Sequence, residues 1–193
     1  MFKEPCAMQL FTSARTHSHW LPKTIEDEVL KELYSLAKLG PTSANSCPAR
    51  FIFIKKAAAK TALINVTNEG NIEKVKSAPV TVIIAWDTEF YEKLPTLTPQ
   101  KQLRDIFASN PKLAHDTAFR NSALQAAYLM MAARTLGLDC GPMSGFDETA
   151  LNNEFFPDGK WKVNFICNLG YGDHSKLHPR NPRLKFEEAC KII

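Results

Sequence analysis

The side chains best suited to chemistry are basic residues at the two ends of the 193-residue chain. Arg15, His17 and His19 alternate near the start, and Arg180 and Arg183 lie near the end. Arginine suits phosphate recognition because its planar guanidinium group forms two charge-assisted hydrogen bonds at once. Taken singly, each of these residues is better explained as part of a solvated, charged surface. A phosphate bound here would be held by side chains and loop amides.

The common signatures of nucleotide, metal and hydrolase sites are missing. The GxxxxGK[ST] loop is absent, and the nearest match to GxGxxG, at residues 170–175, lacks its third glycine and leads into a proline-rich tail. HExxH is absent, and His174 and His178 have no acidic third ligand at a suitable spacing, so we expect no metal. Residues 143–145 read Met-Ser-Gly, which is not the GxSxG elbow of a hydrolase. These patterns leave the catalytic residues unassigned.

Two more groups of polar residues lie between the basic ends. The loop at residues 41–48 is rich in small hydroxyl and amide side chains and is bracketed by prolines; it contains Thr42, Ser43 and Asn45. Asn71 and Lys74 form a second polar pair. Considered alone, a capped turn and an exposed lysine explain these residues better than a binding site does.

The elements that must position these residues are helices mixed with buried strands. Thr24 is expected to cap a helix that runs to Leu39, where Gly40 and Pro41 end it, the glycine by tolerating a left-handed conformation. Strands are predicted at 51–54, 80–86 and about 161–169, and a short helix capped by Asp147 is predicted to reach residue 155. The first two strands are apolar on both faces, so they need layers on both sides. Without regular βαβ alternation, the pattern favours an α+β layered fold, in one domain spanning 1–193.

A long helix is predicted from about residue 113 to 138, which is roughly 39 Å if straight. Its middle, residues 123–133, is apolar nearly all round. A helix without a polar face is buried on all sides. The simplest cover for both faces in a chain of this length is a second subunit, so we expect a homodimer.

Composition limits the function classes. The chain is 45% apolar and 23% charged, with a net charge of +4, which is too weak a balance to indicate nucleic-acid binding. No apolar run approaches the roughly 20 residues of a membrane span, and no signal-peptide core is seen. The five cysteines are widely separated and are expected to be reduced thiols. We expect a cytoplasmic protein with a small-molecule substrate and no membrane or nucleic-acid partner.

Taken together and in order, the motifs resemble the FMN-dependent nitroreductase family. The resemblance rests on Arg-Thr-His-Ser-His at 15–19, Gly-Pro-Thr-Ser-Ala-Asn-Ser-Cys-Pro at 40–48, Asn-x-x-Lys at 71–74 and Gly-Pro-Met-Ser-Gly-Phe-Asp at 141–147. Near the C-terminus, the resemblance also rests on Gly-Tyr-Gly-Asp at 170–173 and Pro-Arg-Leu at 182–184. The strings at 85–92 and 141–147 make it most similar to the malonic semialdehyde reductase branch, which belongs to pyrimidine utilisation. A nitroreductase-like three-layer fold is implied, with a central mixed or antiparallel sheet and a long buried helix at a dimer interface.

The resemblance also implies where FMN binds, at the interface of two subunits. The basic residues at both ends would hold its phosphate and ribityl chain, and the polar residues its ring. The implied contacts with the phosphate and ribityl chain are Arg15, His17, His19, Arg180 and Arg183. The implied contacts from the other subunit are Thr42, Ser43 and Asn45. The implied contacts with the ring are Asn71, Lys74, Ser144 and Gly145. Ser144 stands where some relatives have glutamate.

The implied activity is hydride transfer from NADH or NADPH through flavin N5 to a second substrate, in ping-pong order. For malonic semialdehyde the product is 3-hydroxypropionate, and its carboxylate calls for a cation. Arg120 is the first candidate, with Arg50 and Arg104 as others. Two alternatives stay open: a broad reductase of nitroaromatics, quinones or enones, and a flavin-binding protein without turnover.

Overall fold

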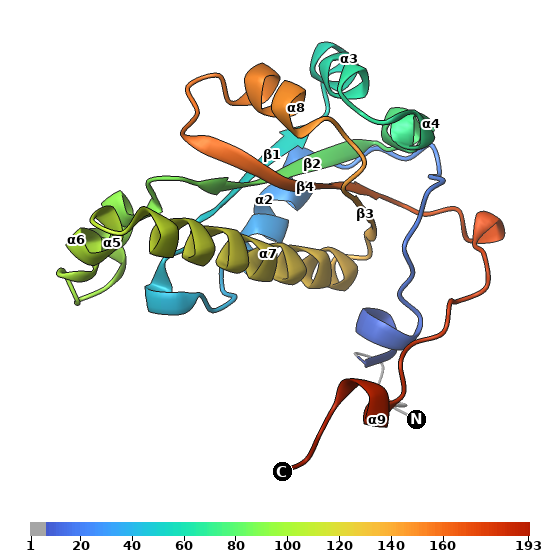
Figure 1. Cartoon of the computed structure of the whole chain (residues 1–193). Coiled ribbons are helices and arrows are strands. Elements are labelled where there is room, and N and C mark those ends of the chain that lie inside the picture. The colour runs from blue at the N-terminus through green and yellow to red at the C-terminus, as the bar shows by residue number, and fades with distance from the viewer. Residues whose placement is uncertain (1–6) are drawn as a thin grey trace.

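A four-stranded antiparallel sheet forms the centre of the molecule, in the strand order β1-β2-β4-β3 (Figure 1). This is a computed structural model, and the structure describes residues 7–193. The strands are β1 (Ala49–Ile54), β2 (Val80–Asp87), β3 (Asp139–Met143) and β4 (Trp161–Gly170). Every residue of β2 is buried. The prediction that this strand needs cover on both faces is therefore confirmed.

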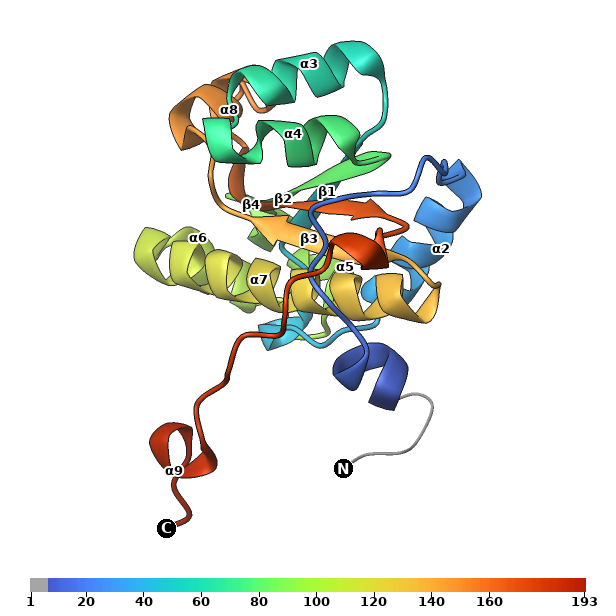
Figure 2. The ribbon, with the colours of Figure 1, turned by 90° about the vertical axis from the view of Figure 1, so that its right-hand side faces the viewer.

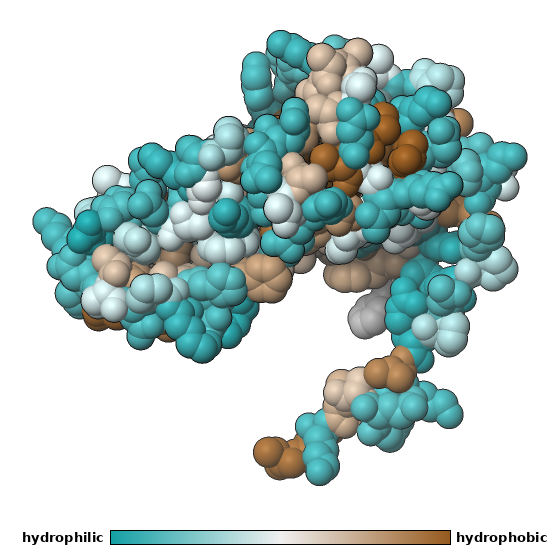
Figure 3. All heavy atoms as spheres, turned by 45° about the horizontal axis from the view of Figure 1, so that its top comes forward, coloured by the Kyte–Doolittle hydropathy of each residue, from teal (hydrophilic) through white to brown (hydrophobic). Residues whose placement is uncertain are grey.

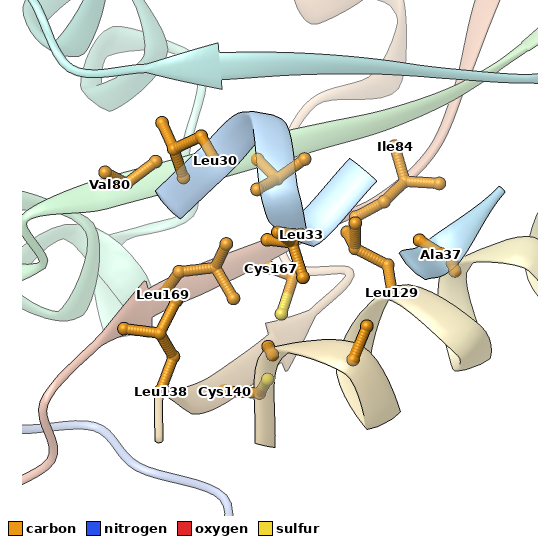
Figure 4. Close-up of a cluster of buried hydrophobic side chains, with 14 of the residues drawn as sticks. Leu30, Leu33, Ala37, Val80, Ile84, Leu129, Leu138, Cys140, Cys167 and Leu169 are labelled. Atoms are coloured by element: carbon orange, nitrogen blue, oxygen red, sulfur yellow. The ribbon is translucent and has the colours of Figure 1, made fainter. Parts of the chain in front are cut away.

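Helices cover both faces of the sheet and give the three layers that the sequence predicts (Figures 1 and 2). One face carries α2 (Asp27–Ala37) and the long α7 (Pro111–Thr135), and the other carries α3 (Ala57–Asn65), α4 (Glu69–Ser77) and α8 (Glu148–Phe155). A cluster of buried side chains fills the first interface, and Figure 4 shows Leu33, Leu129 and Leu169 meeting there. A second cluster, with Leu63, Ile83 and Leu151, fills the other. The α+β expectation is confirmed.

The two ends of the chain run together along the β3 edge of the sheet. The N-terminal segment begins with a π-helical turn, η1 (Met8–Thr12), and Thr16 then forms a parallel bridge with Cys140. The C-terminal segment passes through the short turn η4 (His174–Lys176) and ends with α9 (Phe186–Ala189), away from the body (Figure 2). Figure 3 shows apolar atoms on this projecting segment, where Leu184 is 71% exposed.

The helix predicted from Thr24 is shorter at both ends than expected. Its N-cap is Glu26, without a side-chain cap, and the Thr24 hydroxyl donates to the Glu26 carboxylate instead. The prediction of a left-handed Gly40 is also wrong, because the positive-φ glycines in the described chain are Gly137 and Gly159. Gly40 is needed for space: an added Cβ would lie 2.5 Å from the Tyr128 ring.

The structure contains elements that the sequence patterns did not predict. Strand β3 includes Gly141 and Pro142, residue types that are unfavourable inside a strand, and no strand is predicted there from the sequence. It lies at the edge of the sheet, where a proline does not interrupt a ladder on both sides. Helices α3 and α4 were also missed, as were the short α5 (Leu94–Leu97) and α6 (Leu103–Ala108).

The long helix α7 is confirmed, but within one chain it is not buried on all sides. One face packs on α2 and the sheet, with Leu129 fully buried. Leu124 and Tyr128 on the opposite face are each 41% exposed. None of the described helices combines the length and the hydropathy of a membrane-spanning segment. The four described cysteines are free, and Cys6 lies outside the described residues.

Candidate functional site

A basic cavity of about 390 Å³ lies between the N-terminal and C-terminal segments. We call it the basic cavity. Its lining includes the basic side chains Arg15, His19, Arg134, Lys176, Arg180 and Arg183. The structure thus brings together the arginines from both ends of the sequence. Arg134, at the end of α7, was not predicted, because only the fold places the last turn of that helix beside the chain termini.

Hydrogen bonds hold the two segments around this cavity. Arg15 Nη2 donates to the His178 carbonyl at 2.5 Å, and Arg180 Nη2 donates to the carbonyls of Thr12 and Ala14 at 3.0 and 2.8 Å. A guanidinium group has five N–H donors, so these bonds leave others available. Among residues 7–193, no carboxylate forms an ion pair with Arg15, Arg180 or Arg183. Their positive charge is uncompensated, as anion binding requires.

One acidic side chain, Asp173, also lines the basic cavity. Its carboxylate accepts hydrogen bonds from the backbone N–H and the hydroxyl of Ser175, at 2.9 and 2.7 Å. These bonds hold the pKa of Asp173 below its usual value. The carboxylate is therefore charged at neutral pH, but it is already engaged with its own turn.

His17 differs from its neighbours because its imidazole is buried. The residue is 1% exposed, and Nε2 lies 3.4 Å from Asp139 Oδ1. Its ring also meets the ring of His174 edge-on, with the ring centroids 4.9 Å apart. Burial lowers the pKa of His17, and the nearby Asp139 opposes that shift. The contact that His17 is expected to make with a cofactor stays a prediction.

A second group, Asn71, Lys74 and Gly145, is held together where α4 meets the turn after β3. Lys74 Nζ donates to Asn71 Oδ1 at 2.9 Å, and Asn71 Nδ2 donates to the Gly145 carbonyl at 3.2 Å. The Lys74 carbonyl accepts from Asn168 Nδ2 at 2.9 Å, which anchors α4 to β4. The structure therefore joins Gly145 to Asn71, which is 74 positions away in the sequence. Ser144, beside them, is exposed.

The loop containing Thr42, Ser43 and Asn45 lies elsewhere, against α7. The Ser43 N–H donates to Asn121 Oδ1 at 2.8 Å, and Asn45 Nδ2 donates to the Leu97 carbonyl at 2.7 Å. Ala44, Asn45 and Cys47 have positive φ values of 56°, 50° and 41°. This loop does not line the basic cavity, so one chain does not unite all the residues expected to contact the cofactor.

The three arginines proposed to bind the substrate carboxylate differ in whether they already form ion pairs within the chain. Arg50 Nη2 lies 2.5 Å from Asp87 Oδ2, and Arg50 Nη1 donates to the carbonyls of Cys47 and Ala49. Arg104 is paired with Glu92 and Asp105. Arg120 is exposed on α7, and in the described chain its side chain has no hydrogen bond or ion pair. Of the three, Arg120 has the uncompensated charge.

Comparison with known proteins identifies the family. A family model described as "Nitroreductase family" matches residues 12–171. The chain belongs to the nitroreductase family. A relative from Ralstonia nicotianae, named "Putative NADH dehydrogenase/NAD(P)H nitroreductase", is 57% identical over 191 residues, covering 98% of each chain. One of the same name from Rhodopseudomonas palustris is 55% identical over 190 residues, covering 98% of this chain and 97% of the relative.

Solved structures agree with the nitroreductase assignment at the level of the fold. A nitroreductase from Exiguobacterium sibiricum, solved in complex with FMN, has a TM-score of 0.86 and 18% identity, with 96% of each chain covered. A Bacillus subtilis nitroreductase has a TM-score of 0.83 and 23% identity, covering 96% of this chain and 98% of the other. The three-layer arrangement described above is therefore the nitroreductase fold.

Proposed function

We propose that this member of the nitroreductase family is an FMN-dependent oxidoreductase that uses NADH or NADPH as hydride donor. The observation that carries the proposal is the basic cavity, in which arginines from the two ends of the chain meet without carboxylate partners. Such a cavity fits the terminal phosphate of FMN, because charge-assisted hydrogen bonds to phosphate are strong and arginine makes them in pairs. The names of the relatives and the FMN complex of a fold neighbour support the same assignment.

Different groups of residues would bind different parts of FMN. Arg15, Arg180 and Arg183 would hold the phosphate, with His19 beside them in the basic cavity. The Asn71, Lys74 and Gly145 group would supply hydrogen-bond donors to the ring edge, with Ser144 in the same turn. FMN, when bound, accepts hydride from a reduced nicotinamide and passes it to a second substrate. Lys74 would place a positive charge where negative charge develops, which lowers the energy of that state.

A homodimer would complete the site. The exposed apolar face of α7, with Leu124 and Tyr128, and the projecting C-terminal segment both offer surface that a second copy would cover. The loop with Thr42, Ser43 and Asn45 is remote from the basic cavity in its own chain. In a dimer it would reach the FMN held by the partner copy.

For the substrate, we propose malonic semialdehyde, reduced to 3-hydroxypropionate. The sequence resemblance at 85–92 and 141–147 supports this choice. The substrate carboxylate needs a cation, and Arg120 is the candidate whose charge is uncompensated in the described chain. Arg50 is less suited because Asp87 already neutralises it.

A broader reductase of nitroaromatics, quinones or enones is the second candidate function. The pairing of Arg50 with Asp87 and of Arg104 with Glu92 favours it, because few cations are then left for a carboxylate. A flavin-binding protein without turnover is the third.

Steady-state rates on matched substrates separate these functions. FMN-loaded protein is assayed with NADH or NADPH against malonic semialdehyde, a quinone and a nitroaromatic. The proposal expects kcat/KM for the semialdehyde to exceed the others, and Arg120→Ala to raise its KM while leaving that of the quinone unchanged. Equal rates on all three would favour the broad reductase. No oxidation of either nicotinamide would leave only the binding protein.

A further inference from the structure

His17, Asp139 and His174 form a cluster in which only His17 is also expected to contact FMN. They come from the N-terminal segment, the first residue of β3 and the turn η4. One potential ligand atom from each residue lies within 4.8 Å of the others. His17 is 1% exposed, and its Nε2 is a buried nitrogen without a hydrogen-bond partner among the described residues. A buried polar atom in that state needs a partner.

The spacing suits a metal ion better than a hydrogen bond. Nε2 of His17 and Oδ1 of Asp139 are 3.4 Å apart, and they do not form a hydrogen bond. Two ligands that each lie about 2.0–2.1 Å from a tetrahedral zinc ion are separated by about 3.3–3.4 Å. The His174 side chain lies on the exposed face of the cluster, so it can adjust to close a third ligand position.

The surrounding backbone fixes the two inner ligands. The Gly172 N–H donates to Asp139 Oδ2 at 2.9 Å, which orients the carboxylate and leaves Oδ1 toward His17. Gly172 also packs closely against the imidazole, since an added Cβ would be 2.0 Å from His17 Nδ1. The backbone N–H of His17 donates to the Cys140 carbonyl at 3.0 Å. Hydrogen bonds of this kind to a ligating carboxylate typically orient metal ligands.

We propose that His17, Asp139 and His174 bind one divalent transition-metal ion of the zinc class, with water in the fourth position. Two imidazoles and a carboxylate with an open position are a common ligand set for such ions. No sequence motif indicates this metal site, because its ligands come from three separate segments of the chain. The ion would join the N-terminal segment and η4 to the edge strand, and so would brace both walls of the basic cavity.

The test measures zinc binding to tag-free, full-length Cys190→Ser protein, because exposed Cys190 is a competing ligand. Protein stripped with a chelator is titrated with Zn²⁺ against a chromophoric chelator, with and without FMN, and bound zinc is counted by mass spectrometry. We expect one zinc per chain in either state. His174→Ala and Asp139→Asn should each weaken binding at least tenfold, since loss of second-shell partners alone costs 10- to 100-fold.

His178→Ala is the matched control, since it removes an exposed histidine from the same segment. It should leave zinc affinity unchanged. The proposal is overturned if the parent protein binds no zinc, if His174→Ala and Asp139→Asn bind as well as the parent, or if His178→Ala weakens binding equally. His17→Ala is not used as the primary variant, because removal of a buried imidazole also alters packing.

Discussion

The side-chain amide of Asn71 donates a hydrogen bond to the carbonyl oxygen of Gly145 at 3.2 Å. This bond joins α4 to the turn after β3 and sets the position of Asn71, whose other amide atom accepts from Lys74. The two backbones approach so closely that a Cβ on residue 145 would lie 2.2 Å from Asn71 Nδ2. Gly145 is therefore required by space and not by backbone conformation.

Gly145→Ala tests this close approach. The added methyl group should push the Asn71 amide away and break the contact that orders Asn71 and Lys74. We expect FMN affinity to fall by about tenfold, the scale of one lost hydrogen bond to a charged or well-placed partner. Fluorescence titration with FMN measures the effect. Gly70→Ala, on the helix α4 that carries Asn71 and Lys74, is the control, because its Cβ would meet nothing within 4 Å. If both variants bind FMN alike, the Asn71 contact has no role in binding.

Arg15→Ala and Arg183→Ala test the role of the basic cavity. Each should weaken FMN binding by about 10- to 100-fold, because a hydrogen bond to a charged group contributes roughly 1.5–3 kcal/mol. Binding of riboflavin, which lacks the phosphate, should change little. Lys31→Ala, at an exposed position on α2, serves as control. A parallel loss of FMN and riboflavin affinity would show that these arginines do not act on the phosphate.

Leu124→Glu tests the proposed dimer. A charge on the exposed face of α7 should disfavour burial of that face against a second copy, because an unpaired buried charge is costly. Light scattering at micromolar concentration should change from dimer to monomer, with loss of FMN. Lys112→Glu, near the start of the same helix, should remain dimeric. Monomeric parent protein, or a dimeric Leu124→Glu variant, would contradict the prediction.

Asp87→Asn tests the pairing that occupies Arg50. The side chains of Arg50 and Asp87 are only 21% and 12% exposed, so removing the carboxylate leaves a largely buried cation without its partner. We expect the free energy of unfolding in urea to fall by about 2 kcal/mol, below the roughly 3–5 kcal/mol of a fully buried pair. Glu92→Gln breaks the exposed pair with Arg104 and should lower the free energy of unfolding much less, because solvent screens an exposed ion pair. Equal losses would mean that burial does not strengthen the Arg50 pair.

Strands and helices with strong apolar patterns were predictable, and the others were not. β1 and β2 contain apolar runs, at 51–54 and 80–86, and α7 has a long one. β3 is short, contains a glycine and a proline, and takes its stability from pairing with β4, which leaves no local signal. Helix α4 is polar and contains Gly70, so its packing against the sheet decides its structure more than its sequence pattern does.

The site was predictable only through long motifs. The spacing of Arg15 and Arg183 in the sequence does not predict that they lie close together. The resemblance to the nitroreductase family is what predicts it. The structure places both beside the basic cavity. It also places Arg134 there, and it gathers His17, Asp139 and His174. These contacts depend on how two chain ends follow one sheet edge, which no local pattern encodes.

The visible absorption spectrum of purified protein, followed under anaerobic conditions as NADH or NADPH is added, tests the central claim most directly. The claim is that arginines from both chain ends hold FMN for hydride transfer. We predict a flavin band from bound FMN, confirmed as the phosphate form by mass spectrometry, that bleaches on addition of at least one reduced nicotinamide. A colourless protein that does not take up added FMN would contradict it.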